Sequence, residues 1–112
     1  MIARIWRGTV RLADKERYHD YMKRTGMEEY RDCKGNRRVT LLRRDLEDCC
    51  EFLFLTLWDS YDAIREFAGD DIQKAVYYPE DEQLLLDRGP KIEHFEVLEV
   101  QSPPEARRGG SS

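Results

Sequence analysis

Only a few side chains in this sequence combine a type and a position that could support chemistry. His94 is the one histidine that falls in a predicted strand, and an imidazole with a pKa of about 6.5 can act as a base. Arg4 lies on the same side of the first predicted strand as Trp6, where a guanidinium could stabilise an anion. A structural role competes with the catalytic one, because His94 could equally lie on the surface or in a subunit interface.

Two adjacent tyrosines pose a second question. They follow the stretch FAGDDIQKAV and stand just before PED, so that Tyr77 and Tyr78 end a short predicted helix. Successive helical residues point about 100° apart, so at most one of the pair can face fully into a cavity. Either tyrosine could pack in the core or line a pocket.

Alternation and helical periodicity predict the elements that position these residues. Strands are expected over residues 2–12, 38–44, 51–58 and 91–100. Helices are expected from Asp14 as N-cap to about Tyr30, from Asp59 or Ser60 to Gly69, over 71–78 and over 80–86. The order β-α-β-β-α-β predicts an α+β ferredoxin-like fold, in which helices cover one face of an antiparallel sheet.

The third predicted strand, EFLFLTLW, is apolar on both faces. Phe52, Phe54 and Trp58 share one side, whereas Leu53, Leu55 and Leu57 share the other. Helices account for only one of these sides, so the other needs a different cover. We therefore predict a homodimer in which the sheet faces of two copies pack together.

Composition narrows the function classes. The chain has 112 residues, which predicts one domain over 1–100 followed by a Pro-, Gly- and Ser-rich tail, 101–112, that we expect to be disordered. Acids and bases are interspersed and the net charge is −4, which argues against a nucleic-acid partner. The arginine-rich run 37–44 is interpreted as a solvated edge or dimer rim. No apolar run reaches the ~20 residues of a membrane span, and no signal peptide begins the chain, so a cytoplasmic location is expected.

The sequence also carries no cofactor or metal signature. Its three cysteines, Cys33, Cys49 and Cys50, form no CxxC pair and are expected to be reduced structural thiols. There is no GxGxxG, no phosphate loop and no HxxxH pair. We therefore predict no cofactor and no metal.

Several stretches resemble the antibiotic biosynthesis monooxygenase family. They are IARIWRG, TGMEEYR, LTLWDSYDAIREFAGDDIQKAVYYPED and HFEVLE, and the resemblance covers residues 1 to about 100. It implies the dimeric α+β barrel fold and an oxidoreductase. The family contains cofactor-independent oxygenases of polycyclic phenols, haem-degrading enzymes and quinol-acting members.

The haem-degrading members carry an Asn on the first strand, a Trp on the helix after the third strand and an iron-ligating His further along. Here the corresponding positions hold Trp6 and Arg7, then Phe67, then Tyr77. Although tyrosine can ligate haem iron, these three departures argue against haem degradation. Because Tyr77 stands where those enzymes place their ligand, we predict that Tyr77 lines the pocket and that Tyr78 packs.

The resemblance implies a pocket between sheet and helices, suited to a flat aromatic ligand. The candidate catalytic residues are His94, Arg4 and Tyr77; the candidate substrate-binding residues are Trp6, Tyr18, Tyr21, Trp58 and Phe67. Phe54 and Met22 are expected in the core. The predicted function is a cofactor-independent monooxygenase acting with O₂ on a small aromatic or polyketide-like substrate. The alternatives are a non-catalytic dimeric ligand-binding or accessory protein, and a haem-binding or haem-degrading monooxygenase.

Overall fold

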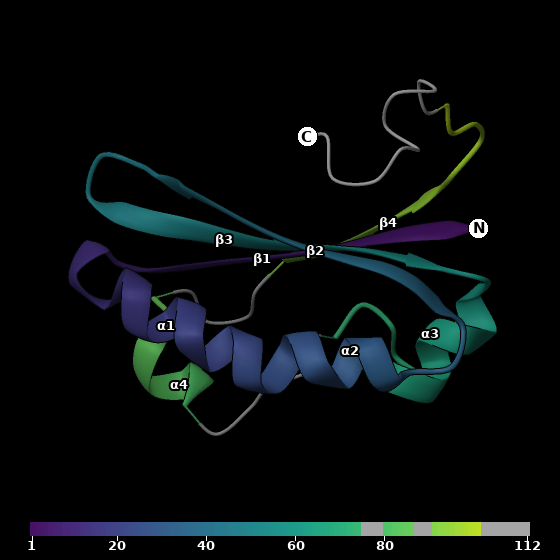
Figure 1. Ribbon diagram of the computed structural model, residues 1–112, viewed down its shortest axis with the longest axis horizontal. Helices are drawn as coiled ribbons and strands as arrows, with labels where there is room; N and C mark the ends of the chain where they lie inside the picture. The colour runs from purple at the N-terminus through teal and green to yellow at the C-terminus, as the bar shows by residue number, and fades with distance from the viewer. Residues whose placement is uncertain (75–79, 87–90, 102–112) are drawn as a thin grey trace, which may run out of the picture.

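A four-stranded antiparallel sheet forms one layer of the computed structural model, and helices cover one of its faces (Figure 1). The structure describes residues 1–74, 80–86 and 91–101, with only the backbone described at Glu82 and Lys91. The strands are β1 (Ile2–Arg11), β2 (Asn36–Asp45), β3 (Cys49–Trp58) and β4 (Lys91–Glu96). Their order in the sheet, β2-β3-β1-β4, confirms the ferredoxin-like α+β fold.

The helical layer begins with one long helical path that changes its geometry three times. It consists of a 3₁₀ turn η1 (Leu12–Asp14), α1 (Lys15–Met22), a π-helical segment η2 (Lys23–Met27) and α2 (Glu28–Asp32). The predicted helix from Asp14 to Tyr30 is therefore present, but a π-helical turn surrounds Gly26. Asp14 is the N-cap residue of α1, as predicted, but its side chain makes no capping bond and its carboxylate accepts a hydrogen bond from Arg11 Nε at 2.9 Å instead.

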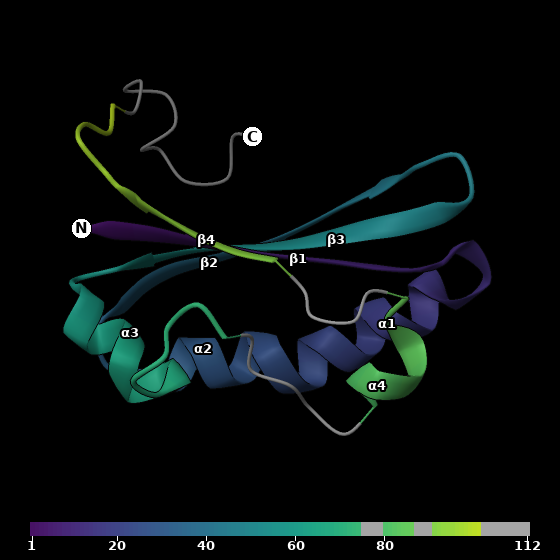
Figure 2. The same ribbon diagram turned by 180° about the vertical axis from the view of Figure 1, so that it is seen from behind.

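Two shorter helices complete this layer: α3 (Tyr61–Ala68) and α4 (Asp81–Leu84). The predicted cap of α3 is correct, because Ser60 Oγ accepts from the backbone N–H of Ala63 at 3.2 Å. Gly69 ends α3 with φ of 88°, a left-handed conformation that favours glycine. Figure 2 shows from behind that α1 to α4 all lie on the same side of the sheet.

The inner face of the sheet carries the core. Along β1 and β3 every second side chain is buried beneath the helices, which is the alternation expected of strands covered on one face. In the register, Trp6 lies opposite Phe54, and Arg4 lies between Thr56 of β3 and His94 of β4. The strands thus align a row of aromatic groups beside a row of polar ones.

The outer face carries the other half of the same strands. Leu53, Leu55 and Leu57 of β3 are half-buried there, with Ala3 and Ile5 of β1 beside them in the register. No described helix covers this face (Figures 1 and 2). The second apolar side predicted for the third strand is therefore present and unused by the described part of the chain.

The predicted bounds of the helices and the strand in the C-terminal half of the chain need correction. Residues 71–74 form a turn rather than the start of a helix, and the helix expected over 80–86 shortens to α4 because Leu85 bridges to Val10. The last strand ends at Glu96 rather than Val100, because Glu96 already pairs with Ile2 at the start of β1. The predicted tail lies outside the described residues except for Gln101. Within the described part of the chain, no helix is long and apolar enough to cross a membrane.

Candidate functional site

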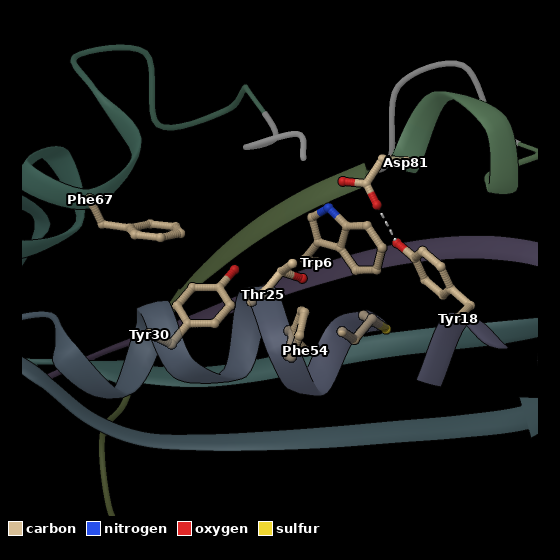
Figure 3. A pocket seen from close by; sticks show the side chains of 9 residues that line it. Trp6, Tyr18, Thr25, Tyr30, Phe54, Phe67 and Asp81 are labelled. Atoms are coloured by element: carbon tan, nitrogen blue, oxygen red, sulfur yellow. Dashed lines mark hydrogen bonds between the residues drawn. The ribbon is translucent and has the colours of Figure 1, made fainter. Parts of the chain in front are cut away.

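A small pocket lies between the long helical path and the inner face of the sheet (Figure 3). Its lining side chains come from every part of the fold: Trp6, Tyr18, Met22, Thr25, Gly26, Tyr30, Phe54, Phe67 and Asp81. The cavity measures about 20 Å³, which is room for about one water molecule. The site is therefore an aromatic box with a few polar groups and little free volume.

One end of the pocket is a buried tyrosine–carboxylate pair. The Tyr18 hydroxyl donates to Asp81 Oδ1 at 2.9 Å, and both side chains are buried (Figure 3). Burial raises the pKa of Tyr18 far above its usual value, and the negative charge of Asp81 adds to the effect. Tyr18 therefore stays protonated and holds the carboxylate in place.

Helix α1 also fixes the backbone that leads into Asp81. The backbone N–H of Glu80 donates to the Tyr21 hydroxyl at 3.0 Å, directly before α4 begins. Two tyrosines on one helix, Tyr18 and Tyr21, thus anchor the start of α4 at its backbone and at its first side chain. This contact positions a carboxylate in an otherwise apolar pocket.

The other end of the pocket is formed by Tyr30. Its ring packs against Phe67 and Phe54, with centroids 4.6 Å and 5.0 Å away, and its hydroxyl points into the box (Figure 3). Burial raises the pKa of Tyr30 to about 12, although the neighbouring guanidinium of Arg4 opposes this shift. Because a guanidinium can only donate, its interaction with the Tyr30 oxygen leaves the hydroxyl proton available to a ligand.

Arg4 lies behind this wall and is almost completely buried, with 1% of its surface exposed. Its Nη2 lies 3.4 Å from the carbonyl oxygens of both Ile72 and Lys74, and its guanidinium carbon lies 5.8 Å from the centre of the Phe67 ring. Its Nε is buried without a partner. Burial lowers the pKa of Arg4 from its usual value, as expected for a desolvated cation.

His94 is the cross-strand neighbour of Arg4 and is half-buried. Its Nδ1 lies 3.4 Å from Nε2 of Gln73, and its own Nε2 is buried without a partner. Burial lowers the pKa of His94, and the positive charge of Arg4 lowers it further. At neutral pH the imidazole is therefore uncharged.

The predicted site residues separate into three groups. Trp6, Tyr18 and Phe67 line the pocket; Tyr21 and Trp58 are buried beside it, with Trp58 Nε1 donating to Thr56 at 2.8 Å. Arg4 and His94 are next to each other but do not line the pocket. Tyr77 and Tyr78 lie outside the described residues. Phe54 and Met22, expected in the core, are buried and also line the box.

The sequence did not reveal two pocket residues with polar ends. The sequence indicated Tyr30 only as the approximate end of the first predicted helix, and Asp81 was given no role. The π-helical segment adds an offset to the helical path before Tyr30, which a pattern counted at 3.6 residues per turn does not include. Gly26 is the one sequence signal: a Cβ there would lie 2.8 Å from the Phe54 ring, so the path approaches the sheet closely only because glycine is present.

The described part of the chain contains no cluster of side chains suited to bind a metal ion. Within residues 1–74, 80–86 and 91–101, no group of three or more His, Cys, Asp or Glu side chains is arranged to hold a metal ion. What the pocket does contain is a carboxylate at one end and a neutral phenol at the other.

Comparison with known proteins supports the fold. No family model matches the sequence, and no curated protein matches it. Among solved structures, a putative antibiotic biosynthesis monooxygenase from Bacillus cereus is similar, with a TM-score of 0.63 and 11% identity over 91% of this chain and 97% of that chain. A monooxygenase from Streptomyces coelicolor, solved in complex with nanaomycin D, has a TM-score of 0.61 and 16% identity over 91% of both chains.

A third similar structure is a variant of a cofactor-independent oxygenase from Streptomyces nogalater. Its TM-score is 0.57 with 20% identity, and the alignment covers 92% of this chain and 96% of that chain. Identities this low establish the fold alone, since one fold hosts many chemistries. The resemblance found in the sequence is thus confirmed in three dimensions: the chain has the fold of the antibiotic biosynthesis monooxygenases.

Proposed function

We propose that the protein is a monooxygenase that oxidises a small phenolic aromatic compound with O₂ and without a bound cofactor. The observation that carries the proposal is the pairing of the Asp81 carboxylate and the Tyr30 hydroxyl at opposite ends of one aromatic pocket (Figure 3). The structural similarity to monooxygenases supports it as an analogy of fold.

The chemistry needs little from the protein. Removing the proton of a phenol gives an electron-rich anion that can reduce O₂ directly. Oxidation of a phenol to a quinone releases four electrons, so one oxygen atom becomes the new carbonyl and the other leaves as water. No external reductant is required. The protein has to accept a proton, stabilise the anion and keep water away.

The pocket offers a residue for each of these tasks. Asp81 is assigned the role of base because its carboxylate lines the pocket and is held by Tyr18. Tyr30 is assigned the role of donor to the substrate oxygen, with Arg4 behind it as the source of positive charge. Trp6 and Phe54 provide the apolar wall. His94 is not assigned the role of base, since it does not line the pocket, and a role for Tyr77 stays a prediction.

The size of the cavity favours one alternative, a non-catalytic protein that binds its ligand only transiently. Pockets for organic ligands usually measure about 300 Å³ or more, whereas this cavity measures about 20 Å³. An aromatic substrate therefore requires the walls to open before it can reach Asp81. Phe67 is a half-buried residue of this wall.

We further propose that the working unit is a homodimer formed through the outer face of the sheet. The half-buried leucines of β3 and the exposed Phe95, with 51% of its surface accessible, form a continuous apolar surface with Ala3 and Ile5. The three free cysteines support a reducing compartment, for which we propose the cytoplasm.

The test of the activity is O₂ consumption with flat phenols such as naphthols and hydroxylated anthracenes. Asp81→Asn should lower kcat at least 100-fold, because a positioned base contributes about 10²–10⁴ in rate. Tyr30→Phe should lower kcat about tenfold or more through loss of one hydrogen bond to the anion. Tyr61→Phe removes a hydroxyl outside the pocket and serves as the matched control.

The alternative makes a different prediction in the same assay. If phenols bind with saturable affinity but no O₂ is consumed above the spontaneous rate, the protein is a binding module. If a folded Asp81→Asn variant keeps full activity, Asp81 is not the base.

A further inference from the structure

Arg4 is a buried cation that has no counter-ion among the residues that the structure describes. Neighbouring arginines in the sheet are paired with acids, as Arg7 is with Glu93 at 3.0 Å and Arg43 is with Glu16 at 3.0 Å. In the described part of the chain Arg4 forms no ion pair, although only 1% of its surface is exposed. Burying a charge without its partner is costly, so a fold that retains one without a described counter-charge calls for a reason.

The contacts that Arg4 does make compensate for this burial only in part. Two carbonyl oxygens lie at 3.4 Å from Nη2, which is long for a charged hydrogen bond, and the Phe67 ring offers only its π face. Tyr30 is neutral. The Nε–H of the guanidinium is buried and has no acceptor among the described residues.

His94 contributes a second unsatisfied donor at the same place. It is the register partner of Arg4, and cross-strand neighbours on one face have Cβ atoms about 5 Å apart. The Gln73 amide nitrogen at 3.4 Å is a donor, so Nδ1 of His94 is the acceptor and the proton of the neutral ring resides on Nε2. That Nε2–H is buried and has no partner.

We propose that Arg4 and His94 form an oxyanion site, separate from the pocket, that binds a carboxylate group. Two buried N–H donors, one of them on a permanent cation, require acceptors that also carry negative charge. A carboxylate supplies two acceptor oxygens, and guanidinium groups bind carboxylates well because their N–H groups match this geometry. A water molecule would satisfy the hydrogen bonds but not the charge.

Among the described residues, the surroundings of Arg4 favour an anion on one edge of the guanidinium. The carbonyl oxygens of Ile72 and Lys74 occupy the Nη2 edge and would repel it. The Nε edge is free of described acceptors, and the Tyr61 ring, 6.1 Å from the imidazole, is uncharged there. The carboxylate has two conceivable sources: a small free acid, or the acidic arm of a ligand whose aromatic part occupies the pocket beyond Tyr30 and Phe67.

The experiment follows the two imidazoles by NMR while formate or 1-naphthoate is added. His94 should shift and saturate, whereas His19, which lies on α1 away from the site, should not. Arg4→Met should abolish the shift, and Arg38→Met, at an exposed arginine on β2, should leave it unchanged. If formate saturates the shift, a small free acid is sufficient for binding. If only 1-naphthoate does so, the carboxylate is the arm of a ligand that also occupies the pocket, and Gly26→Ala should then weaken the binding of 1-naphthoate.

A thermal measurement keeps the proposal testable if Arg4→Met does not fold. Formate or 1-naphthoate should raise the Tm of the unmodified protein in a concentration-dependent way, and His94→Phe should reduce that rise at least twofold. The proposal is wrong if neither acid causes a saturable shift. It is also wrong if the shift is undiminished in Arg4→Met or the Tm rise is undiminished in His94→Phe. In these cases the two donors would bind water rather than a carboxylate. A saturable shift without any O₂ consumption would retain the site and remove only the oxygenase activity.

Discussion

The two faces of the sheet use the same strands for different purposes. On β1, Arg4 and Trp6 face the helices while Ile5 faces outward; on β3, Phe54 faces inward and Leu55 outward. The inner face is built from aromatic rings with polar groups at their edges, and the outer face from aliphatic side chains. Aromatic rings with polar ends can orient a ligand, whereas aliphatic rows provide area for association but no direction. This difference is the reason for proposing ligand binding on the inner face and assembly on the outer face.

The largest effect is expected on the outer face. Leu55→Asp places a carboxylate in the centre of the aliphatic surface, and burying an unpaired charge costs several kcal/mol. We expect the dimer to dissociate or the fold to be lost, as measured by sedimentation and thermal unfolding. Lys23→Asp, at an exposed position on the helical layer, is the control. A stable dimer of Leu55→Asp would show that assembly uses another surface.

On the inner face, the next-largest effect is expected at Gly26, where the helical path lies very close to the sheet. Gly26→Ala puts a Cβ 2.8 Å from the Phe54 ring, and overpacking of this kind costs about 2 kcal/mol. Urea unfolding should show the loss. The same substitution in a Phe54→Leu background should cost less, because the smaller side chain leaves room. Equal costs in both backgrounds would mean that the clash is relieved by a shift of the helix.

The tyrosine–carboxylate pair should contribute less to stability than to positioning. Tyr18→Phe removes the donor to Asp81 and should lower the free energy of unfolding by about 1–2 kcal/mol, because the carboxylate stays buried with one hydrogen bond fewer. Tyr21→Phe releases only the backbone N–H of Glu80 and should cost about 1 kcal/mol. Chemical denaturation of both variants makes the comparison, and a larger loss for Tyr21→Phe would reverse their roles.

The smallest expected effect is on the pH dependence of stability. Burial and Arg4 lower the pKa of His94 in the folded protein, so the unfolded chain binds a proton more readily below its usual pKa of about 6.5. The contribution of His94 to the free energy of unfolding is therefore present above pH 6.5, and it is lost as the pH falls from about 6.5 toward the pKa of His94 in the folded protein. Urea unfolding at pH 7.5 and 5.5 should therefore show a smaller difference for His94→Phe than for the unmodified protein. An identical difference would mean that His94 takes up its proton equally in both states.

Local patterns predicted the parts of the fold that depend on neighbours in the sequence. The period of two in residues 2–11 and 49–58 determines which side chains share a face, because strand geometry repeats every second residue. Ser60 and Gly69 delimit α3 through bonds that span only three or four residues. The doubly apolar third strand likewise predicted an apolar face that the helices do not cover, and no described helix covers it.

The tertiary structure alone decided the polar part of the site. Tyr18 and Asp81 meet across 63 positions of sequence, and Asp81 belongs to a short helix with no pattern that marks it as functional. Tyr30 lines the pocket from α2, which follows a π-helical segment that local sequence patterns do not reveal. The burial of Arg4 without an ion pair in the described part of the chain is equally invisible in the sequence. An alternating strand shows that a side chain faces inward but not what it contacts there. Faces follow from the local geometry of the backbone, whereas partners follow from contacts between distant segments.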